Sequence, residues 1–203
     1  MIQLQQRSLE PKVTSMIKSF FASTKALAGK PSYKVFNSSG TVVVTIPYFM
    51  PSSVPVLAES KINALGIAIT RLFNVPGALA GRAQPTVELR LVRLRYPYLD
   101  SSILAQYVAV NAGKYNFLRM QKMMFNKVPA TARGATQTNV LPSQMTGVKV
   151  ELAGRLTTQR SIPRKTVENG HVGSFTVNNT LKSSLDFSQY ASKNKLNAFT
   201  IKV

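Results

Sequence analysis

The amino-acid sequence predicts an α+β protein of two small units. Segments with apolar residues at every third or fourth position alternate with segments in which apolar and polar residues alternate one by one, and neither kind dominates. The stretch GALAGRAQP at 77–85 is typical of a linker, so we expect one unit over 1–85 and another over 86–203. A chain of 203 residues with 44% hydrophobic residues is sufficient for a core in each unit.

The first unit should contain two helices and a β-hairpin. A helix is predicted over 9–29, where apolar residues recur with helical spacing and Gly29 stands at the position of a left-handed stop. A hairpin follows over 33–49, with its turn at Asn37-Ser38-Ser39-Gly40. A second amphipathic helix is expected over about 56–74.

The second unit is predicted to hold a helical segment, a polar loop and several strands. Residues 99–128 fit one bent helix or two, with Asp100 or Ser101 as the first cap, and the loop spans about 129–145. In the strand TVELRLVRLR the alternation of apolar and polar residues shifts by one residue near Leu91–Val92, so apolar residues fall on both faces of the strand. This pattern indicates either a β-bulge or a strand that is buried on both faces. The expected strands are 86–95, 147–152, 172–177, 183–188 and 196–203.

Charge is the most unusual property of this sequence. It has 26 lysines and arginines against 7 aspartates and glutamates, giving a formal net charge of +19. Such an excess favours a place beside a polyanion, with nucleic acid as the first candidate and an anionic membrane surface as the second. No apolar run reaches the roughly 18 residues of a membrane span. The absence of cysteine excludes disulfide scaffolds, cysteine-ligated zinc and cysteine nucleophiles.

No arrangement of residues suits a hydrolytic or phosphoryl-transfer enzyme. The acids are scattered, and no phosphate-binding loop, dinucleotide fingerprint or metal-ligating histidine motif occurs. We expect no catalytic residues, no metal site, no cofactor and no small-molecule substrate; a metal-dependent nuclease would have to rely on Glu151 and Glu168. His171, the single histidine, follows the turn signal Asn169-Gly170 and is either an exposed loop residue or an RNA contact.

Cationic residues gather in two segments that suit RNA. In the irregular stretch GRLTTQRSIPRK, planar guanidinium groups can bind phosphate in a bidentate manner, and the alternative is a solvated basic loop. On the expected helix, Arg119, Lys122 and Asn126 share a face, which is either an RNA contact or simply the solvated side of the helix. The four cations of the irregular stretch are Arg155, Arg160, Arg164 and Lys165.

The segment that begins at Gly147 resembles a known signature. Its sequence GVKVELAGRL is similar to the G-[IV]-K-[IV]-x-[IVL]-x-G-R-L strand in the C-terminal domain of the universal small-subunit ribosomal protein three family. The helical stretch 99–128, the strand before it and the closing TIKV also resemble this family, so the likeness covers about 86–203. The version TTQRSIPRKTVENGHVGSF is most similar to the mitochondrial branch found in fungi, which is encoded in the organelle.

For the fold, the resemblance implies a type II KH domain in the first unit and the family's α/β C-terminal domain in the second. The KH loop G-x-x-G is missing here, since Met50-Pro51-Ser52-Ser53-Val54-Pro55 stands in the matching place. Glycine is needed in that loop because the backbone approaches the nucleotides closely. We therefore expect a degenerate KH-like unit that does not clamp single strands, followed by the C-terminal ribosomal protein domain with an inserted loop at about 129–145.

For function, the resemblance implies a structural constituent of the head of the mitochondrial small ribosomal subunit, in the mitochondrial matrix. Its partners would be small-subunit rRNA, mRNA and neighbouring head proteins, with no membrane. In the family, the helix corresponding to 115–128 borders the mRNA entrance, which assigns that role to Arg119, Lys122 and Lys127. Leu118 and Met123 stand where the bacterial pattern has basic residues, so channel lining is implied rather than unwinding. The implied rRNA-binding residues are Arg155, Arg160, Arg164, Lys165 and His171.

The residues alone leave another class of protein open. A free-standing RNA-binding factor, or an intron-maturase-type protein, would carry the same excess of basic side chains. Sedimentation with the ribosomal subunit distinguishes the two classes, because a free factor should be released at moderate salt.

Overall fold

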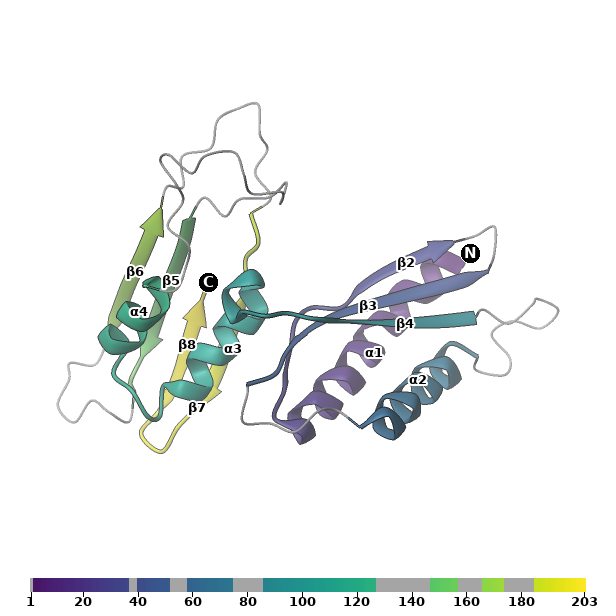
Figure 1. Ribbon diagram of the computed structural model, residues 1–203, viewed down its shortest axis with the longest axis horizontal. Coiled ribbons are helices and arrows are strands. Elements are labelled where there is room, and N and C mark those ends of the chain that lie inside the picture. Colours follow the sequence, from purple (N-terminus) through teal and green to yellow (C-terminus); the bar gives the residue numbers. More distant parts are fainter. Residues whose placement is uncertain are drawn as a thin grey trace, which may run out of the picture. The chain divides into compact units, whose positions relative to one another are not determined.

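The computed structural model describes residues 2–36, 40–51, 58–74, 86–126, 147–156, 166–173 and 185–203. Helices and sheets are both present, which confirms the α+β class (Figure 1). The chain divides into two compact units, Met1–Pro97 and Tyr98–Val203. We expected the division at residues 85 and 86. It lies later because the strand that begins at Thr86 pairs with a strand of the first unit.

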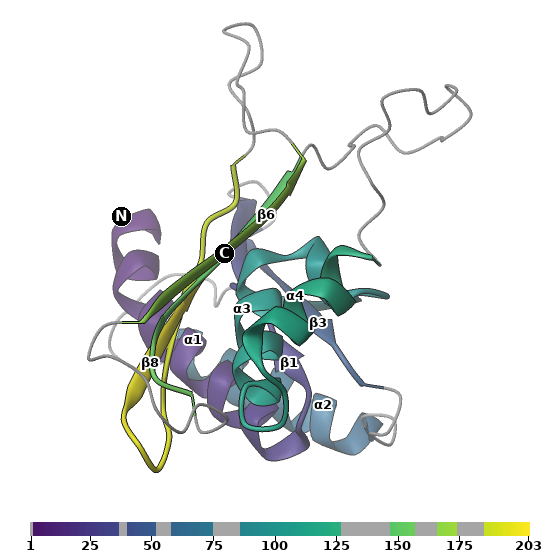
Figure 2. The same ribbon diagram turned by 90° about the vertical axis from the view of Figure 1, so that its left-hand side faces the viewer.

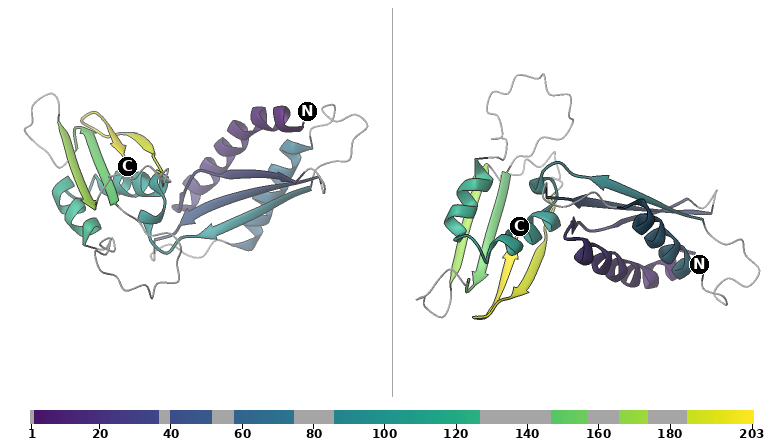
Figure 3. Two further views of the ribbon diagram at one scale, coloured as in Figure 1. Left: turned by 90° about the horizontal axis from the view of Figure 1, so that it is seen from above. Right: turned by 60° about the horizontal axis from the view of Figure 1, so that its bottom comes forward.

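Unit 1 is a mixed sheet with two helices packed on one of its faces. The central strand β3 pairs antiparallel with β1 and β2 on one side and parallel with β4 on the other (Figures 1 and 3). Side chains from both helices and from β3, such as Ile17, Ile69 and Val44, are buried in one core. Its elements are α1 (Ile2–Thr24), β1 (Leu27–Ala28), β2 (Ser32–Phe36), β3 (Thr41–Phe49), α2 (Glu59–Phe73) and β4 (Thr86–Arg93).

The first helix ends earlier than expected. Lys25 takes the left-handed conformation, with φ of 58°, directly after the last helical residue, Thr24. Gly29 was expected to fill this role, but its N–H instead donates to the carbonyl of Pro47 over 2.8 Å. The chain therefore turns at Lys25 and has room for β1 before Gly29. The expected hairpin is confirmed in its strands, since β2 pairs with β3 from Ser32↔Thr45 to Phe36↔Thr41.

Strand β4 has neither the bulge nor the burial on both faces that its apolar pattern predicted. Its pairing with β3 runs without interruption from Thr41↔Thr86 to Tyr48↔Arg93, so there is no bulge near Leu91–Val92. Leu91 packs against the unit 1 core, whereas Val92 is 45% exposed on the other face. The apolar residue on the other face, Val92, is thus exposed to solvent, and that face of the strand is not buried.

Unit 2 is a four-stranded antiparallel sheet with two helices on one face. The strand order is β6-β5-β8-β7, and the segment expected as one bent helix or two is two helices (Figure 2). The strands expected at 172–177 and 183–188 lie instead at 167–173 and 189–193. After the short 3-10 turn Pro97–Leu99, the elements are α3 (Ser101–Asn111), α4 (Phe117–Phe125), β5 (Gly147–Gly154), β6 (Val167–Gly173), β7 (Gln189–Lys193) and β8 (Ala198–Lys202). The expected loop at 129–145 lies outside the described residues.

The helices cover the inner face of this sheet through a closely packed core. Val150, Leu152 and Ile201 from the strands are fully buried together with Phe117 from α4. Gly170 of β6 lies against the side chain of Gln121, and a Cβ at this glycine would overlap that side chain. The close approach of α4 to β6 therefore depends on a glycine that the sequence presented as part of a turn.

Candidate nucleic-acid interface

The few acidic side chains serve the fold of the protein itself. At the start of α3, Oδ1 of Asp100 accepts the N–H of Ile103 over 2.9 Å, which confirms Asp100 as the cap. Oδ2 of Asp186 accepts the N–H of Ser101 over 3.0 Å at the same helix end. Carboxylates stabilise a helix N-terminus because its first N–H groups have no partner within the helix. Burial, and less strongly repulsion from Asp186, raise the pKa of Asp100.

Two further acids are paired with basic side chains on strands. Glu88 lies 2.7 Å from Arg90 within β4, and Glu151 of β5 lies 2.9 Å from Lys202 of β8. The hydrogen bond from Arg90 lowers the pKa of Glu88, and the bond from Lys202 lowers the pKa of Glu151. Glu59 occupies the first turn of α2, where a negative charge is favourable. These acids already interact with groups close to them. Most of the cations on the described surface therefore have no acid to neutralise them.

Three further findings concern metal ions, membrane spans and the acid pair Glu151 and Glu168. They contain no group of three or more acidic or histidine side chains that could hold a metal ion. None of the described helices is long and apolar enough to cross a membrane. Glu151 and Glu168, the pair that a nuclease would need, do not lie on the same face of the sheet. Leu152 stands opposite Glu168 in the β5–β6 register, and Leu152 faces the core whereas its neighbour Glu151 faces away.

Arg155 stands at the end of β5, directly after a glycine in a conformation that other residues rarely adopt. Gly154 has φ of 119°, and a Cβ there would lie 2.7 Å from the carbonyl oxygen of Ala198. The carbonyl of Arg155 accepts a hydrogen bond of 2.7 Å from the side chain of Asn194. Leu156 is fully buried, so the core extends two residues beyond Gly154. Arg160, Arg164 and Lys165 lie outside the described residues.

His171 lies in strand β6 and not in a loop. Asn169 and Gly170, which suggested a turn, pair in the ladder with Glu151 and Val150. His171 stands opposite Lys149 of β5, and both side chains are exposed. The structure thus places an unpredicted lysine beside the predicted histidine. Sequence spacing could not have found this neighbour, because it depends on the register between two strands.

The exposed face of α4 carries two of the predicted cations. Arg119 and Lys122 are both exposed, as is Asn126, which follows the last residue of the helix. The guanidinium of Arg119 lies 5.2 Å from the centre of the Tyr115 ring, within the range of a cation–π contact. This contact limits the positions that the arginine can adopt. Lys127, the third predicted residue of this surface, lies outside the described residues.

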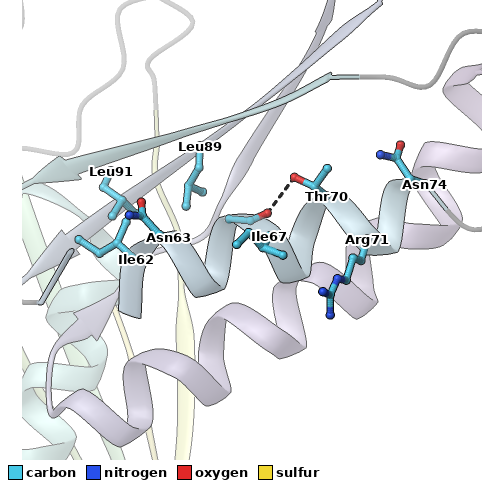
Figure 4. Close-up of a pocket in the computed structure, with 9 residues that line it drawn as sticks. Ile62, Asn63, Ile67, Thr70, Arg71, Asn74, Leu89 and Leu91 are labelled. Carbon is cyan, nitrogen blue, oxygen red and sulfur yellow. Dashed lines mark hydrogen bonds between the residues drawn. The ribbon is translucent and has the colours of Figure 1, made fainter. Parts of the chain in front are cut away.

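Unit 1 carries a groove between α2 and β4 (Figure 4). Ile62 and Ile67 line it from the helix, and Leu89 and Leu91 line it from the strand. Gly66 leaves this part of the helix without a side chain, and Thr70 bonds to the Gly66 carbonyl over 2.8 Å. Arg71 is the cation of the groove, and Asn63, Thr70 and Asn74 are its polar side chains.

The fold and these surfaces define a class of protein, which is a basic two-unit α+β protein whose acids stabilise its own elements. Residues 26–203 match the family model described as mitochondrial ribosomal protein (VAR1). The chain is also 34% identical over 188 residues to "Small ribosomal subunit protein uS3m" of Mycosarcoma maydis, covering 89% of this chain and 68% of that relative. The chain belongs to the VAR1 family of mitochondrial ribosomal proteins.

Family membership settles several of the expectations from sequence. The resemblance to the fungal mitochondrial branch of small-subunit ribosomal protein three is confirmed, and with it a ribosomal role in mitochondrial translation. A location in the mitochondrial ribosome follows from the family as well. The individual RNA-binding residues remain predictions, which the next subsection develops.

Proposed function

We propose that this chain is a structural constituent of the small mitochondrial ribosomal subunit that binds rRNA in the subunit head and borders the mRNA entrance. It has no catalytic role in this proposal. The resemblance at 86–203 and the relative named as a small-subunit protein support the choice of subunit. Its partners are rRNA, mRNA and neighbouring head proteins.

One observation carries the RNA-binding part of the proposal. Four of the seven acids, Asp100, Asp186, Glu88 and Glu151, bond to a helix N-terminus or pair with a nearby cation, while the sequence holds 26 lysines and arginines. Free cations on a folded surface repel one another, and an RNA backbone removes that repulsion by supplying phosphates. A protein with this distribution of charge is therefore stabilised by the partner that we propose.

We assign the two RNAs to different surfaces of unit 2. Ribosomal RNA is bound through the segment that follows β5 and through His171, and mRNA passes the exposed face of α4. Arg155 supports the first assignment because Asn194 fixes its backbone at the start of the basic segment. The exposure of Arg119 and Lys122 on α4 supports the second. The remaining residues of the two proposed surfaces are Arg160, Arg164, Lys165 and Lys127.

Unit 1 acts in this proposal as a degenerate KH-like unit of type II. The order α1, β2, β3, α2, β4 follows the helix, hairpin, helix and strand expected from the sequence, with one described helix where the type II KH order has two between the strands. Because G-x-x-G is absent, the groove between α2 and β4 lacks the glycine loop that holds a nucleotide backbone. We expect unit 1 to position the protein and not to clamp single-stranded RNA.

Sedimentation of mitochondrial extracts tests the proposed function. In a magnesium-containing gradient at moderate salt, the chain should migrate with the small subunit. A chain that stays at the top of the gradient, or leaves the subunit when the salt is raised moderately, would indicate the alternative, a free-standing RNA-binding or intron-maturase-type factor. The groove gives a second measurement, because a short single-stranded RNA should bind unit 1 no more tightly than a surface with the same charge does.

A further inference from the structure

The sheet of unit 2 has an outer face that neither α3 nor α4 covers. The helices pack on the face that carries Val148, Val150 and Leu152, so the alternate residues of β5 point to the other side (Figure 2). The registers of β6, β8 and β7 extend this face across all four strands. Its side chains are Lys149, Glu151, Ala153, Val167, Asn169, His171, Gln189, Ala191, Lys193, Ala198, Thr200 and Lys202.

The charge of this outer face is positive. Three lysines stand against the single acid Glu151, and Lys202 already holds that acid at 2.9 Å. Lys149 and Lys193 are exposed and form no ion pair with a described residue. They lie on different strands, β5 and β7, and the charge of Lys149 also acts on Glu151 of its own strand. The registers place Lys193 level with Arg155, which follows β5 and lies six residues along the chain from Lys149. The two lysines are therefore about 10 Å apart across the strands and about 20 Å apart along them.

The outer face is also mostly polar, with many short side chains. Between the two lysines lie the Glu151–Lys202 ion pair and small or hydroxylated side chains, among them Ala153, Thr200 and Ala191. Val167, on the edge strand, is its one large exposed apolar side chain. Protein interfaces are centred on aromatic and other large apolar side chains, and this face has no aromatic side chain and only Val167 at its edge. A nucleic-acid backbone, by contrast, can approach small side chains closely and is bound through phosphates and 2′-hydroxyls.

We infer that this outer face is a docking site for the sugar–phosphate backbone of structured rRNA, with Lys149 and Lys193 each neutralising a phosphate. The inference rests on the proposed function and adds to it a surface distinct from the segment after β5. His171, opposite Lys149, and Asn169 supply hydrogen-bonding groups at the β6 edge of the same face. The complementary charge of the lysines identifies RNA as the occupant.

The outer face of the unit 1 sheet differs in the properties that matter. There Arg90 is paired with Glu88, Lys34 is exposed, and Phe36 and Val92 are 49% and 45% exposed. One exposed lysine beside a neutralised arginine and two large apolar side chains suits a phosphate backbone less well than the outer face of unit 2 does. The comparison separates an exposed sheet face in general from the basic, mostly polar face of unit 2.

The inferred site gives unit 2 two RNA surfaces on opposite sides of one layer. Helix α4 carries Arg119 and Lys122 on the side of the sheet where the helices pack, and Lys149 and Lys193 lie on the other side. Unit 2 would thus stand between rRNA on its sheet and mRNA on its helices. Contacts with rRNA would hold α4 at its place beside the message.

The double variant Lys149→Gln/Lys193→Gln tests the inference in the full-length protein with a small-subunit rRNA transcript as probe. We measure the slope of log affinity against log salt concentration. Because two phosphate contacts are lost, this slope should be shallower in the variant than in the wild type by about 1.5. The matched control is Lys12→Gln/Lys18→Gln, which removes the same charge from the exposed side of α1 and should leave the slope nearer to the wild-type value. Ala191→Glu, which places an anion on the outer face, should weaken binding as well. Circular dichroism establishes that each variant is folded.

The outcomes separate this inference from the function on which it rests. A steep salt dependence in the wild type that is equal in the outer-face and α1 variants would overturn the inference and leave the proposed function standing. A flat dependence in the wild type would contradict RNA binding itself. If the outer-face variant binds the transcript normally but is lost from the small subunit, the face contacts a protein, and the inference is wrong.

Discussion

At the scale of single residues, Gly154 is the position where backbone conformation matters most for the proposed RNA surface. It combines a φ of 119° with close contact to the backbone of β8. Because Arg155 follows directly, the direction in which the basic segment leaves β5 depends on a conformation that side-chain-bearing residues rarely adopt. The motif G-R-L that suggested the family thus has a physical basis in this structure.

Gly154→Ala should destabilise unit 2. A Cβ would lie 2.7 Å from the Ala198 carbonyl oxygen and 2.8 Å from Cα of Phe199, both of them backbone atoms. We expect a loss of about 1–3 kcal/mol in the free energy of unfolding, measured by urea denaturation. Gly113→Ala is the control, because a Cβ there meets no atom within 4 Å, and it should change stability by less than about 0.5 kcal/mol. Equal effects of the two substitutions would contradict the argument.

Asp100→Ala should weaken the start of α3. The substitution removes the acceptor for the Ile103 N–H and should lower the free energy of unfolding by about 1 kcal/mol. Asp100→Asn keeps an oxygen acceptor, so its loss should be smaller. Thermal unfolding of the two variants side by side measures the difference, and an alanine variant as stable as the asparagine variant would show that the cap is unimportant.

The same carboxyl group should contribute a defined pH dependence. Burial is the main cause that raises the pKa of Asp100 above its ordinary value of 3.8, so the folded state holds this proton more tightly than the unfolded state. Its contribution to stability is therefore full below the unfolded pKa and is lost as pH rises through the folded pKa. Relative to Asp100→Asn, the wild type should lose stability over this rise in pH, as measured by urea denaturation at a series of pH values. A constant difference would contradict the raised pKa.

At the scale of elements, local signals in the sequence predicted helices well and strands less well. The cap Asp100 and the division of 99–128 into two helices depend on nearby residues, and the sequence offered each as one of two alternatives. Gly170 was misinterpreted as part of a turn because its role depends on a contact in the tertiary structure. It reads as a turn beside Asn169, yet it lies in β6 to make room for Gln121 of α4. Val92 was misinterpreted for a related reason, because the spacing of apolar residues along a strand does not reveal which of them stay exposed.

The candidate site likewise combines residues that local sequence groups together with residues that only the tertiary structure brings together. Arg119 and Lys122 share an exposed helix face, and helical periodicity was sufficient to group them. Lys149 and Lys193 could not be grouped from sequence, because they meet on one face only through the strand order β6-β5-β8-β7. Surfaces on one helix follow from local spacing, whereas surfaces across a sheet require the topology.

Substitutions on the two proposed surfaces of unit 2 should have different effects. Arg155→Ala and Arg164→Ala should reduce incorporation into the small subunit more than Arg119→Ala does. The loss of one charged hydrogen bond, about 1.5–3 kcal/mol, corresponds to tenfold or more in RNA affinity. Arg119→Ala should instead reduce translation of messages with stable secondary structure. Quantification of each variant in purified subunits and in a translation assay measures both effects. If Arg119→Ala blocks assembly while the other two are silent, the surfaces are reversed.

At the scale of the whole molecule, the net charge of +19 should dominate the thermodynamics of RNA binding. Each phosphate contact releases counterions and contributes about −0.7 to −0.9 to the slope of log affinity against log salt. A protein that contacts several phosphates should therefore lose affinity by orders of magnitude over a modest increase in salt, as measured by filter binding. A flat response would contradict the electrostatic basis of the proposal.

The strand order of unit 2 also has a consequence for the timing of synthesis. Strand β8 lies between β5 and β7, although it is the last of the described strands along the chain. Phe199 and Ile201 of this strand complete the core, and Asn194, just before it, holds Arg155. A nascent chain emerges from its N-terminus, so unit 1 has all its described strands once β4 has emerged, whereas unit 2 must wait for β8. The RNA-facing geometry of unit 2 is thus a late product of translation, and the nascent protein cannot engage rRNA through unit 2 before that strand has been made.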